Sequence, residues 1–198
     1  MRPDLLHAAV FDLDGTLTHG GHDFAAIKRR LGLDPGTPLT EGLMALAEPR
    51  RSRAWAEVEA WEEELAEVAV ADPAAHSLLA ALQTRGVRLG VLTRNTRATA
   101  LRSLAVAGLA DFFDPEHVIG RHEATPKPDP EGLWLLLRAW SVQPHHALMV
   151  GDAPHDTATG LAIGTFAVGV DPRGRRNFGA VHAVVRDLAE LSVFLGHT

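Results

Sequence analysis

The stretch FDLDGT, residues 11–16, decides the fold predicted for this chain. It ends the apolar run HAAVFDL, residues 7–13, and short apolar runs bounded by turn residues are typical of buried parallel strands. Alternate residues of a strand share one side, so Asp12 and Asp14 point into the same region just where Gly15 allows a tight turn. Two carboxylates this close repel each other unless a cation lies between them or one is protonated. The stretch therefore predicts a strand end that carries either a plain acidic turn or a chemical site.

Apolar runs of the same kind recur along the chain at VRLGVLT (87–93), HVIG (117–120), ALMVGD (147–152) and TFAVGV (165–170). Helix-length segments lie between them, and several begin with a capping residue or a proline, as at Asp72-Pro73 and Asp129-Pro130. The tail HAVVRDLAELSVFL predicts a short last strand and a closing helix. Strands that alternate with helices predict an α/β fold, in which a parallel sheet is covered by helices on both faces.

One interval breaks this alternation. Residues 18–72 contain three segments with helical patterns and no convincing strand, and the next strand is predicted only from Val87. We therefore predict an all-helical subdomain inserted at residues 18–72, after the first strand. The α/β core would then consist of residues 1–17 and 73–198.

The composition excludes several classes of function. The formal net charge is −6, from 19 basic and 25 acidic residues, without a long basic stripe, so a nucleic-acid partner has little electrostatic support. The chain has no cysteine, which excludes disulfides and thiolate metal sites. No apolar run approaches the roughly 18 residues of a membrane span, and acidic residues in the N-terminal apolar stretch argue against a signal peptide. We expect a cytoplasmic monomer or small homo-oligomer that acts on a small molecule, without membrane or nucleic-acid partners.

Polar residues also follow the other predicted strands. Thr93 and Asn95 lie at a helix start, where a hydroxyl and free backbone N–H groups can hold an anion. Asp152 and Asp156 follow the fourth apolar run, and Lys127 lies between prolines in TPKPDP, which present it rigidly as a point charge for phosphate. Taken singly, each has a plainer explanation as a helix cap, a first-turn acid or an exposed loop residue. Because ligands of open parallel sheets bind at the carboxyl ends of the strands, the set predicts one site there.

Taken in order, the stretches DLDGT, VLTRN, PKP and GDAPHD resemble the haloacid dehalogenase-like hydrolase superfamily, in the branch of phosphoglycolate phosphatases and beta-phosphoglucomutases. The resemblance spans nearly the whole chain, including GRHEATPKPDP and the final DLAEL. It implies a Rossmann-like α/β core, and it implies that the inserted helices are a cap that closes over the site and excludes water. The insertion is shorter than the four-helix caps of such relatives, which leaves the substrate open.

The resemblance implies a Mg²⁺-dependent phosphatase of a small phosphorylated metabolite, phosphoglycolate-like or a sugar phosphate. Asp12 would be the nucleophile that forms an aspartyl-phosphate, and Asp14 would be the general acid and then the base that activates water. Mg²⁺ would be held by Asp12, Asp152 and the main-chain carbonyl of Asp14, with Asp156 in support. The phosphoryl oxygens would be bound by Thr93, the N–H of Arg94, Asn95 and Lys127.

Several other activities remain open at this point. Dehalogenases of the superfamily need the nucleophile but not the acid two residues on, so Asp14 favours phosphoryl transfer. A phosphomutase of the beta-phosphoglucomutase type would use the same residues and pass the phosphoryl group to a sugar. Phosphonoacetaldehyde hydrolases need a cap lysine for a Schiff base, and Lys28 is the only candidate. A non-catalytic binding protein would keep the fold, but the repulsion between Asp12 and Asp14 would then have no evident purpose.

Within the predicted cap, the candidates for contact with substrate are His22, Arg50, Arg51 and Arg53. The arginines would meet a carboxylate or second phosphate, although a solvated helix start is the plainer explanation. His22 follows the nucleophile loop and would approach the leaving group, or else belong to a hinge. Trp55 and Trp61 are expected to pack within the cap, and the three glutamates at 62–64 to form a solvated face.

Overall fold

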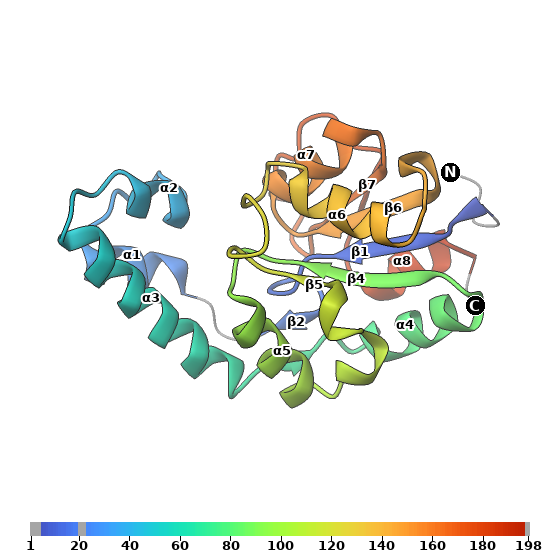
Figure 1. Ribbon diagram of the computed structural model, residues 1–198. Coiled ribbons are helices and arrows are strands. Elements are labelled where there is room, and N and C mark those ends of the chain that lie inside the picture. Colours follow the sequence, from blue (N-terminus) through green and yellow to red (C-terminus); the bar gives the residue numbers. More distant parts are fainter. Residues whose placement is uncertain (1–4, 20–22, 197–198) are drawn as a thin grey trace.

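A six-stranded parallel sheet forms the centre of the protein, and the computed structural model describes residues 5–19 and 23–196 (Figure 1). The strands are β1 Ala8–Phe11, β4 Arg88–Leu92, β5 Val118–Ile119, β6 Ala147–Gly151, β7 Phe166–Val170 and β8 Ala183–Val185. Their order in the sheet is β5-β4-β1-β6-β7-β8, and each neighbouring pair is parallel. The predicted α/β fold with a parallel sheet is confirmed.

Helices cover both faces of this sheet. They are α4 Ala75–Thr84, α5 Arg97–Val106, α6 Glu131–Ala139, α7 Pro154–Ile163 and α8 Leu188–Phe194, with short 3-10 helices at Ala110–Phe112, Pro115–His117 and Pro144–His146. Side chains alternate along β1, so Ala9 and Phe11 pack with α4, α5 and α8, whereas Ala8 and Val10 pack with α6 on the other face. Both faces of β1 are therefore buried, which explains its continuous apolar run.

The position of β1 between β4 and β6 brings three strand ends together. Phe11, the last residue of β1, is in register with Val91 of β4 and with Val150 of β6. The residues that follow these strands therefore emerge side by side at the carboxyl edge of the sheet, where ligands of open parallel sheets bind.

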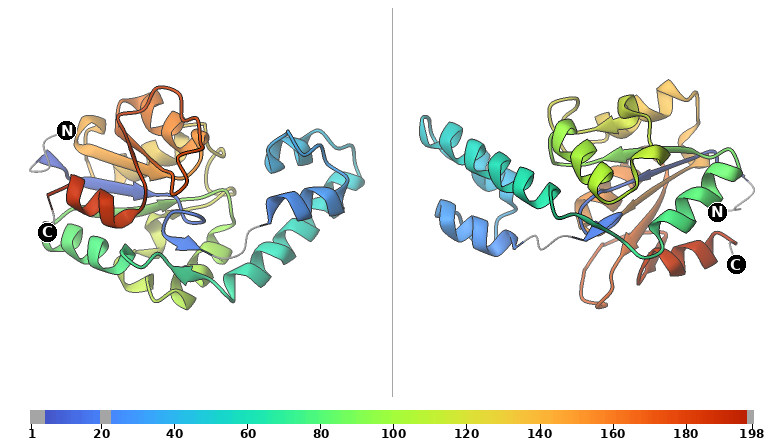
Figure 2. Two further views of the ribbon diagram at one scale, coloured as in Figure 1. Left: turned by 180° about the vertical axis from the view of Figure 1, so that it is seen from behind. Right: turned by 90° about the horizontal axis from the view of Figure 1, so that it is seen from below.

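Three helices form a separate part of the molecule beyond this edge (Figures 1 and 2). They are α1 Phe24–Leu31, α2 Leu39–Met44 and α3 Arg50–Ala66. They share a small apolar core made of Ile27, Leu31, Leu33, Leu43, Ala54 and Val58. The helices thus bury much of their apolar surface against one another.

The interval between residues 18 and 72 contains two short strands, which the sequence analysis did not predict. β2 (Thr18–His19) pairs antiparallel with β3 (Val70–Ala71), so that Thr18 lies opposite Ala71 and His19 opposite Val70. Two-residue strands are too short to show an alternating pattern, which is why the sequence did not reveal them. The pairing joins the chain that enters the helical segment to the chain that leaves it.

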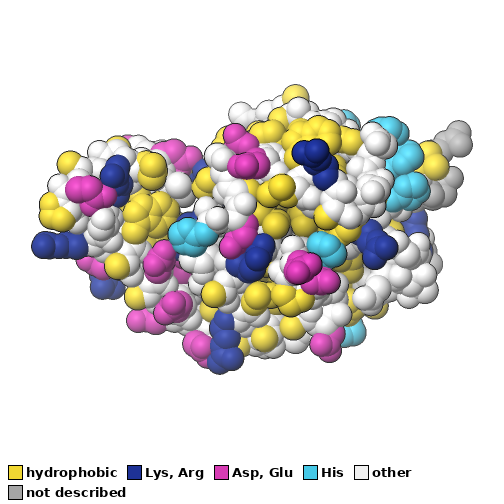
Figure 3. Space-filling view, in the orientation of Figure 1, with side chains coloured by type: hydrophobic (Ala, Val, Ile, Leu, Met, Phe, Trp, Pro, Cys, Tyr) yellow, Lys and Arg dark blue, Asp and Glu magenta, His cyan; other side chains and the backbone are white. Residues whose placement is uncertain are grey.

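The surface carries mixed charges. On the face shown in Figure 3, acidic and basic side chains are interspersed over both the helical part and the sheet-bearing part. Within the described residues, no helix combines the length and the apolar composition needed to cross a membrane.

Two leucines of α6 provide a matched test of the packing on one sheet face. Leu133 is fully buried against the sheet, whereas 43% of Leu135 is exposed. Leu133→Ala should lower the free energy of unfolding by about 2–5 kcal/mol, because it removes buried methyl groups and leaves a cavity. Leu135→Ala should change it by no more than about 0.5 kcal/mol. Urea unfolding followed by tryptophan fluorescence measures both, and equal losses would contradict the described packing of α6.

Candidate active site

The carboxyl ends of adjacent strands supply the polar side chains of the site. Asp12, Thr93 and Asp152 each follow the last residue of a strand, namely β1, β4 and β6. The N–H of Asp12 donates to the Val150 carbonyl at 2.8 Å, and the N–H of Thr93 donates to the Ile119 carbonyl at 2.9 Å. These bonds continue the sheet by one residue and fix where the side chains begin.

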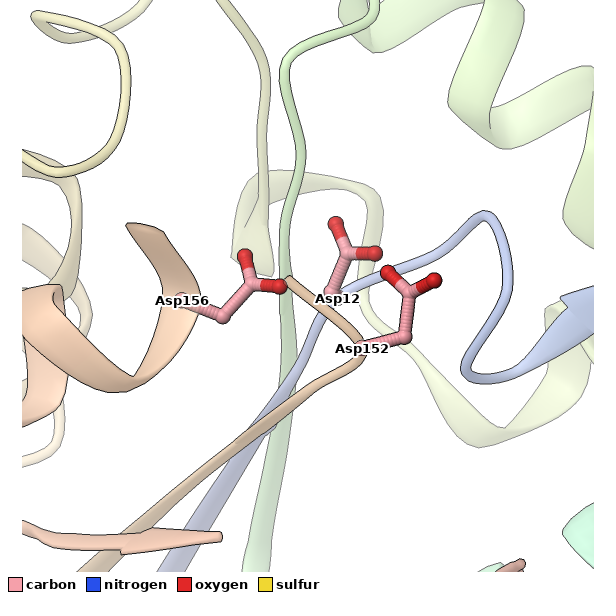
Figure 4. A group of neighbouring side chains, drawn as sticks. All are labelled: Asp12, Asp152 and Asp156. Atoms are coloured by element: carbon pink, nitrogen blue, oxygen red, sulfur yellow. The ribbon is translucent and has the colours of Figure 1, made fainter. Parts of the chain in front are cut away.

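Asp12, Asp152 and Asp156 form a group of carboxylates, each offering an oxygen within 4.8 Å of the others. Figure 4 shows them gathered around one point, with Asp156 coming from the first turn of α7. Asp156 Oδ2 also accepts a hydrogen bond from the Ala153 N–H at 2.9 Å, which holds its carboxylate in place. Carboxylate oxygens are the ligands that hard divalent cations such as Mg²⁺ prefer. This donor set therefore fits the predicted ion.

Two glycines lie so close to these carboxylates that a side chain at either position would clash with them. A Cβ atom at Gly15, where φ is +86°, would lie 2.4 Å from Asp152 Oδ2. A Cβ atom at Gly151 would lie 2.2 Å from the Cβ of Asp156. The glycine of FDLDGT is thus needed both for the turn and for the close approach of Asp152.

Lys127 places a buried positive charge between two of the carboxylates. Its Nζ atom lies 2.5 Å from Asp12 Oδ1 and 2.7 Å from Asp156 Oδ1, and its side chain is fully buried. Burial alone would lower the pKa of Lys127, but the charges of Asp12 and Asp156 outweigh burial and raise it. Lys127 therefore stays protonated and offsets the repulsion between the acids.

Burial has the opposite effect on the acids of this group. It raises the pKa of Asp12 well above its ordinary value against the opposing charge of Lys127, and Asp156 and Asp152 raise it further. Burial also raises the pKa of Asp152, which Arg176 opposes. Arg176 Nη1 lies 2.5 Å from Asp152 Oδ2 and also donates to the Asp152 main-chain carbonyl. The loop after β7 supplies this arginine, which the sequence analysis missed because it belongs to no strand end or motif.

Asp14 lies outside the three-carboxylate group and has a different environment. Its Oδ2 atom accepts a hydrogen bond from Asn95 Nδ2 at 2.6 Å, and its Oδ1 atom accepts one from Thr18 Oγ1 at 3.3 Å. Thr93 Oγ1 in turn accepts a hydrogen bond from the Asn95 N–H at 3.1 Å. The two acids of FDLDGT thus face different partners.

The side chain of Arg94 connects the sheet-bearing part to the helical part. It donates to the Lys127 main-chain carbonyl from Nε at 2.9 Å and to Glu41 Oε1 on α2 from Nη2 at 2.8 Å. The guanidinium is therefore engaged in structural bonds, and the prediction for Arg94 concerns its N–H.

These residues surround a cavity of about 440 Å³ between the two parts of the molecule. From the sheet edge, the lining includes Asp12, Asp14, Thr93, Arg94, Asn95 and Asp152. From the helical part, it includes Phe24, Lys28, Pro38, Leu39, Trp55 and Glu62. A cavity of this size holds a small organic molecule.

The structure places the cap arginines outside this cavity, which agrees with the plainer explanation of a solvated helix start. Among the described residues that line the cavity, none of Arg50, Arg51 and Arg53 appears. Arg50 Nη2 donates to the Leu31 carbonyl at 3.0 Å, Arg51 Nε pairs with Glu48 at 2.8 Å, and Arg53 is exposed. His22 lies outside the described residues.

The expectation of a solvated face at residues 62–64 is wrong for Glu62. Its side chain is only 8% exposed, and both of its oxygens accept from Arg121 Nη1, at 3.0 and 2.8 Å. The buried residues of α3 are Ala54, Val58, Glu62 and Ala66. This spacing of four residues was a signal for the buried position of Glu62, because it continues an apolar stripe of the helix. Arg121 was missed because a single loop arginine carries no pattern.

Lys28 lines the cavity, but its ammonium group is bound within the helical part. It donates to the Pro35 carbonyl at 2.6 Å and to the Thr37 carbonyl at 3.2 Å. Both bonds hold the loop between α1 and α2.

Comparisons with known proteins identify the family. The family model of the haloacid dehalogenase-like hydrolases matches residues 6–164. A phosphoglycolate phosphatase from Rhodospirillum rubrum is 34% identical over 222 residues, covering 96% of this chain and 90% of that protein. A putative pyrophosphatase PpaX from Clostridium perfringens is 30% identical over 192 residues, covering 84% of both chains. The crystal structure of a beta-phosphoglucomutase from Clostridium difficile shares the fold, with a TM-score of 0.74 at 19% identity over 94% of this chain and 93% of that chain.

This chain therefore belongs to the haloacid dehalogenase-like hydrolase family, as the order of its motifs predicts.

Lys127→Met tests whether the buried ammonium holds the acids together. The change leaves Asp12 and Asp156 buried without a counter-charge, so the free energy of unfolding in EDTA should fall by about 3–5 kcal/mol. Adding Asp156→Asn should recover part of this loss, because one uncompensated charge is removed. Lys28→Met, at the only other lysine of the chain, should cost about 1 kcal/mol. Equal effects of the two lysine variants in urea unfolding would contradict the role of Lys127.

Proposed function

We propose that this protein is a Mg²⁺-dependent phosphatase that hydrolyses a small phosphorylated metabolite through an aspartyl-phosphate on Asp12. The observation that carries the proposal is the difference between the two acids of FDLDGT. Both acids line the cavity, but Asp12 is held by the Lys127 ammonium at 2.5 Å, among other carboxylates, whereas Asp14 accepts a hydrogen bond from Asn95 at 2.6 Å. This difference supports a division of roles in which Asp12 is the nucleophile and Asp14 exchanges the proton.

In the first step, a carboxylate oxygen of Asp12 forms a bond to phosphorus while the bond from phosphorus to the leaving oxygen breaks. Protonated Asp14 gives its proton to that oxygen, which departs as an alcohol. In the second step, Asp14 takes a proton from water, the water oxygen attacks phosphorus, and the bond to Asp12 breaks to release phosphate. Thr93, the N–H of Arg94, Asn95 and Lys127 stabilise the phosphoryl oxygens throughout.

Mg²⁺ would be held by the carboxylates of Asp12 and Asp152 and by the main-chain carbonyl of Asp14, with Asp156 in support. When bound, the ion neutralises charge on the transferring phosphoryl group. The support for this proposal is the all-oxygen donor group at the strand ends.

We propose that residues 18–72 act as a cap over this site and select the substrate. Phosphoglycolate is the first substrate to test, because the relative from Rhodospirillum rubrum is named for it. The wall that the helices present is largely apolar, with Phe24, Leu39 and Trp55 in the lining. A panel should therefore also contain pyrophosphate, sugar phosphates and esters with larger apolar groups.

Asp12→Asn tests the nucleophile. The purified protein should release phosphate from p-nitrophenyl phosphate with Mg²⁺, and the variant should lose at least about 10³-fold in rate because an amide oxygen cannot form the covalent intermediate. Asp111→Asn, at an exposed aspartate, is the matched control and should retain full activity. Equal activity of Asp12→Asn and the native protein would sink the mechanism. Conversion of β-glucose 1-phosphate into glucose 6-phosphate would instead identify a mutase. Metal binding without turnover of any ester on the panel would identify a binding protein.

Asp152→Asn tests the metal site independently of activity. Removal of one carboxylate ligand should weaken Mg²⁺ binding by at least about 10-fold in calorimetric titration, and it should raise the Mg²⁺ concentration needed for half-maximal rate. Asp111→Asn again serves as the control. Unchanged Mg²⁺ affinity in Asp152→Asn would place the ion elsewhere.

A further inference from the structure

Arg121, in the loop after β5, forms a buried bridge between the sheet-bearing part and α3. Its side chain is only 5% exposed. Nη1 donates to both oxygens of Glu62, Nη2 donates to Glu59 Oε1 at 3.3 Å, and the guanidinium lies 4.9 Å from the centre of the Trp55 ring. Three residues of α3 therefore hold one arginine of the sheet-bearing part.

The same arginine binds the main chain beside the proposed phosphate site. Arg121 Nη1 donates to the Arg94 carbonyl at 2.9 Å, and the Arg121 N–H donates to the Asn95 carbonyl, also at 2.9 Å. Asn95 then donates from its side chain to Asp14 Oδ2 at 2.6 Å. Glu62 on α3 is thus linked to the carboxylate of Asp14 through the side chain and main chain of Arg121 and through Asn95.

The burial of this pair argues that it positions groups rather than adding stability. A buried ion pair is often no more stabilising than apolar residues of similar volume, because both charges lose their hydration. Glu62 occupies a position in the apolar stripe of α3 where alanine and valine stand one turn away on each side. A glutamate at this position orients the guanidinium of Arg121 by accepting its hydrogen bonds, which an apolar residue would not do.

We propose that Glu62 and Arg121 are positioning residues that fix the main chain of Arg94 and Asn95 and, through Asn95, orient Asp14 for proton transfer when α3 lies against the sheet edge. This inference rests on the proposed function, in which Asp14 is the acid and base. The helical segment would then do more than exclude water, since its placement would complete the orientation of the proton-transfer group.

The pH dependence of kcat provides a further test of this proposal. Burial raises the pKa of Glu62 to about 7 against the opposing charge of Arg121, and Asp14 and Glu59 raise it further. Glu62 therefore gains a proton as the pH falls through about 7, which weakens its hold on Arg121. A glutamine at this position does not titrate.

Glu62→Gln, Arg121→Lys and Arg121→Met test the proposal in the full-length protein. The matched controls are Glu63→Gln, at an exposed neighbour on α3, and Arg102→Met, which removes the exposed ion pair of Arg102 with Glu67 at 2.6 Å. With an alkyl phosphate that the native protein hydrolyses, Arg121→Met should lose about 10- to 100-fold in kcat with little change in KM. Arg121→Lys should recover part of the loss, and both controls should match the native protein.

Single-turnover kinetics separate positioning from direct binding of substrate. p-Nitrophenolate leaves without protonation, so its first release by Arg121→Met should stay within about threefold of the native rate while the alkyl ester is slowed. The ratio of native kcat to Glu62→Gln kcat should fall as the pH is lowered through about 7. Adding Glu62→Gln to Arg121→Met should cause no further loss, because the two residues act as one unit.

Two results would overturn the inference while leaving the proposed function intact. The first is a kcat equal to the native value in both Arg121→Met and Glu62→Gln. The second is a rise in the KM of Arg121→Met without a change in kcat, which would make Arg121 a substrate-binding residue. If thermal unfolding shows that Arg121→Met does not fold, two other measurements test the inference. They are the kcat of Arg121→Lys and the pH dependence of the ratio of native kcat to Glu62→Gln kcat. Failure of the proposed function is distinct, since the native protein would then hydrolyse none of the esters.

Discussion

The buried ammonium of Lys127 is the interaction on which the site depends. Three carboxylates from the end of β1, the loop after β6 and the first turn of α7 converge on one point, and their mutual repulsion would push these elements apart. Lys127 contacts two of them at 2.5 and 2.7 Å from a loop between β5 and α6. One positive charge thereby holds together segments that are far apart in the sequence.

Charge pairs join the helical segment to the sheet-bearing part. Arg94 binds Glu41 of α2, Arg121 binds Glu62 of α3, and Arg102 binds Glu67 just after α3. Only the pair of Arg121 and Glu62 is buried, so it alone is largely protected from screening by salt. The buried apolar residues that form the core of the helical segment pack against one another.

The residues at strand ends were predictable because a parallel sheet gathers them. Once HAAVFDL, VRLGVLT and ALMVGD are assigned as parallel strands, the residues that follow them must meet at one edge. No comparable rule predicts which residues of the helical segment face the cavity. Arg50, Arg51 and Arg53 lie outside the cavity, and Glu62 is buried where a solvated face was expected, because the exposure of a helix face depends on what packs against it. The two-residue pairing of β2 with β3 was too short to leave a pattern.

The sequence by itself determined the α/β fold, the family and the set of acids, threonine and lysine in the motifs that follow the strands. These are local properties, since apolar runs, turn residues and motif order are all written within short stretches of chain. Only the tertiary structure decided which residues complete the cavity, namely Arg121, Arg176 and Glu62, and which cap arginines stay outside it. The reason is physical: a contact between distant segments depends on relative placement, and a single charged residue in a loop or helix does not encode its partner.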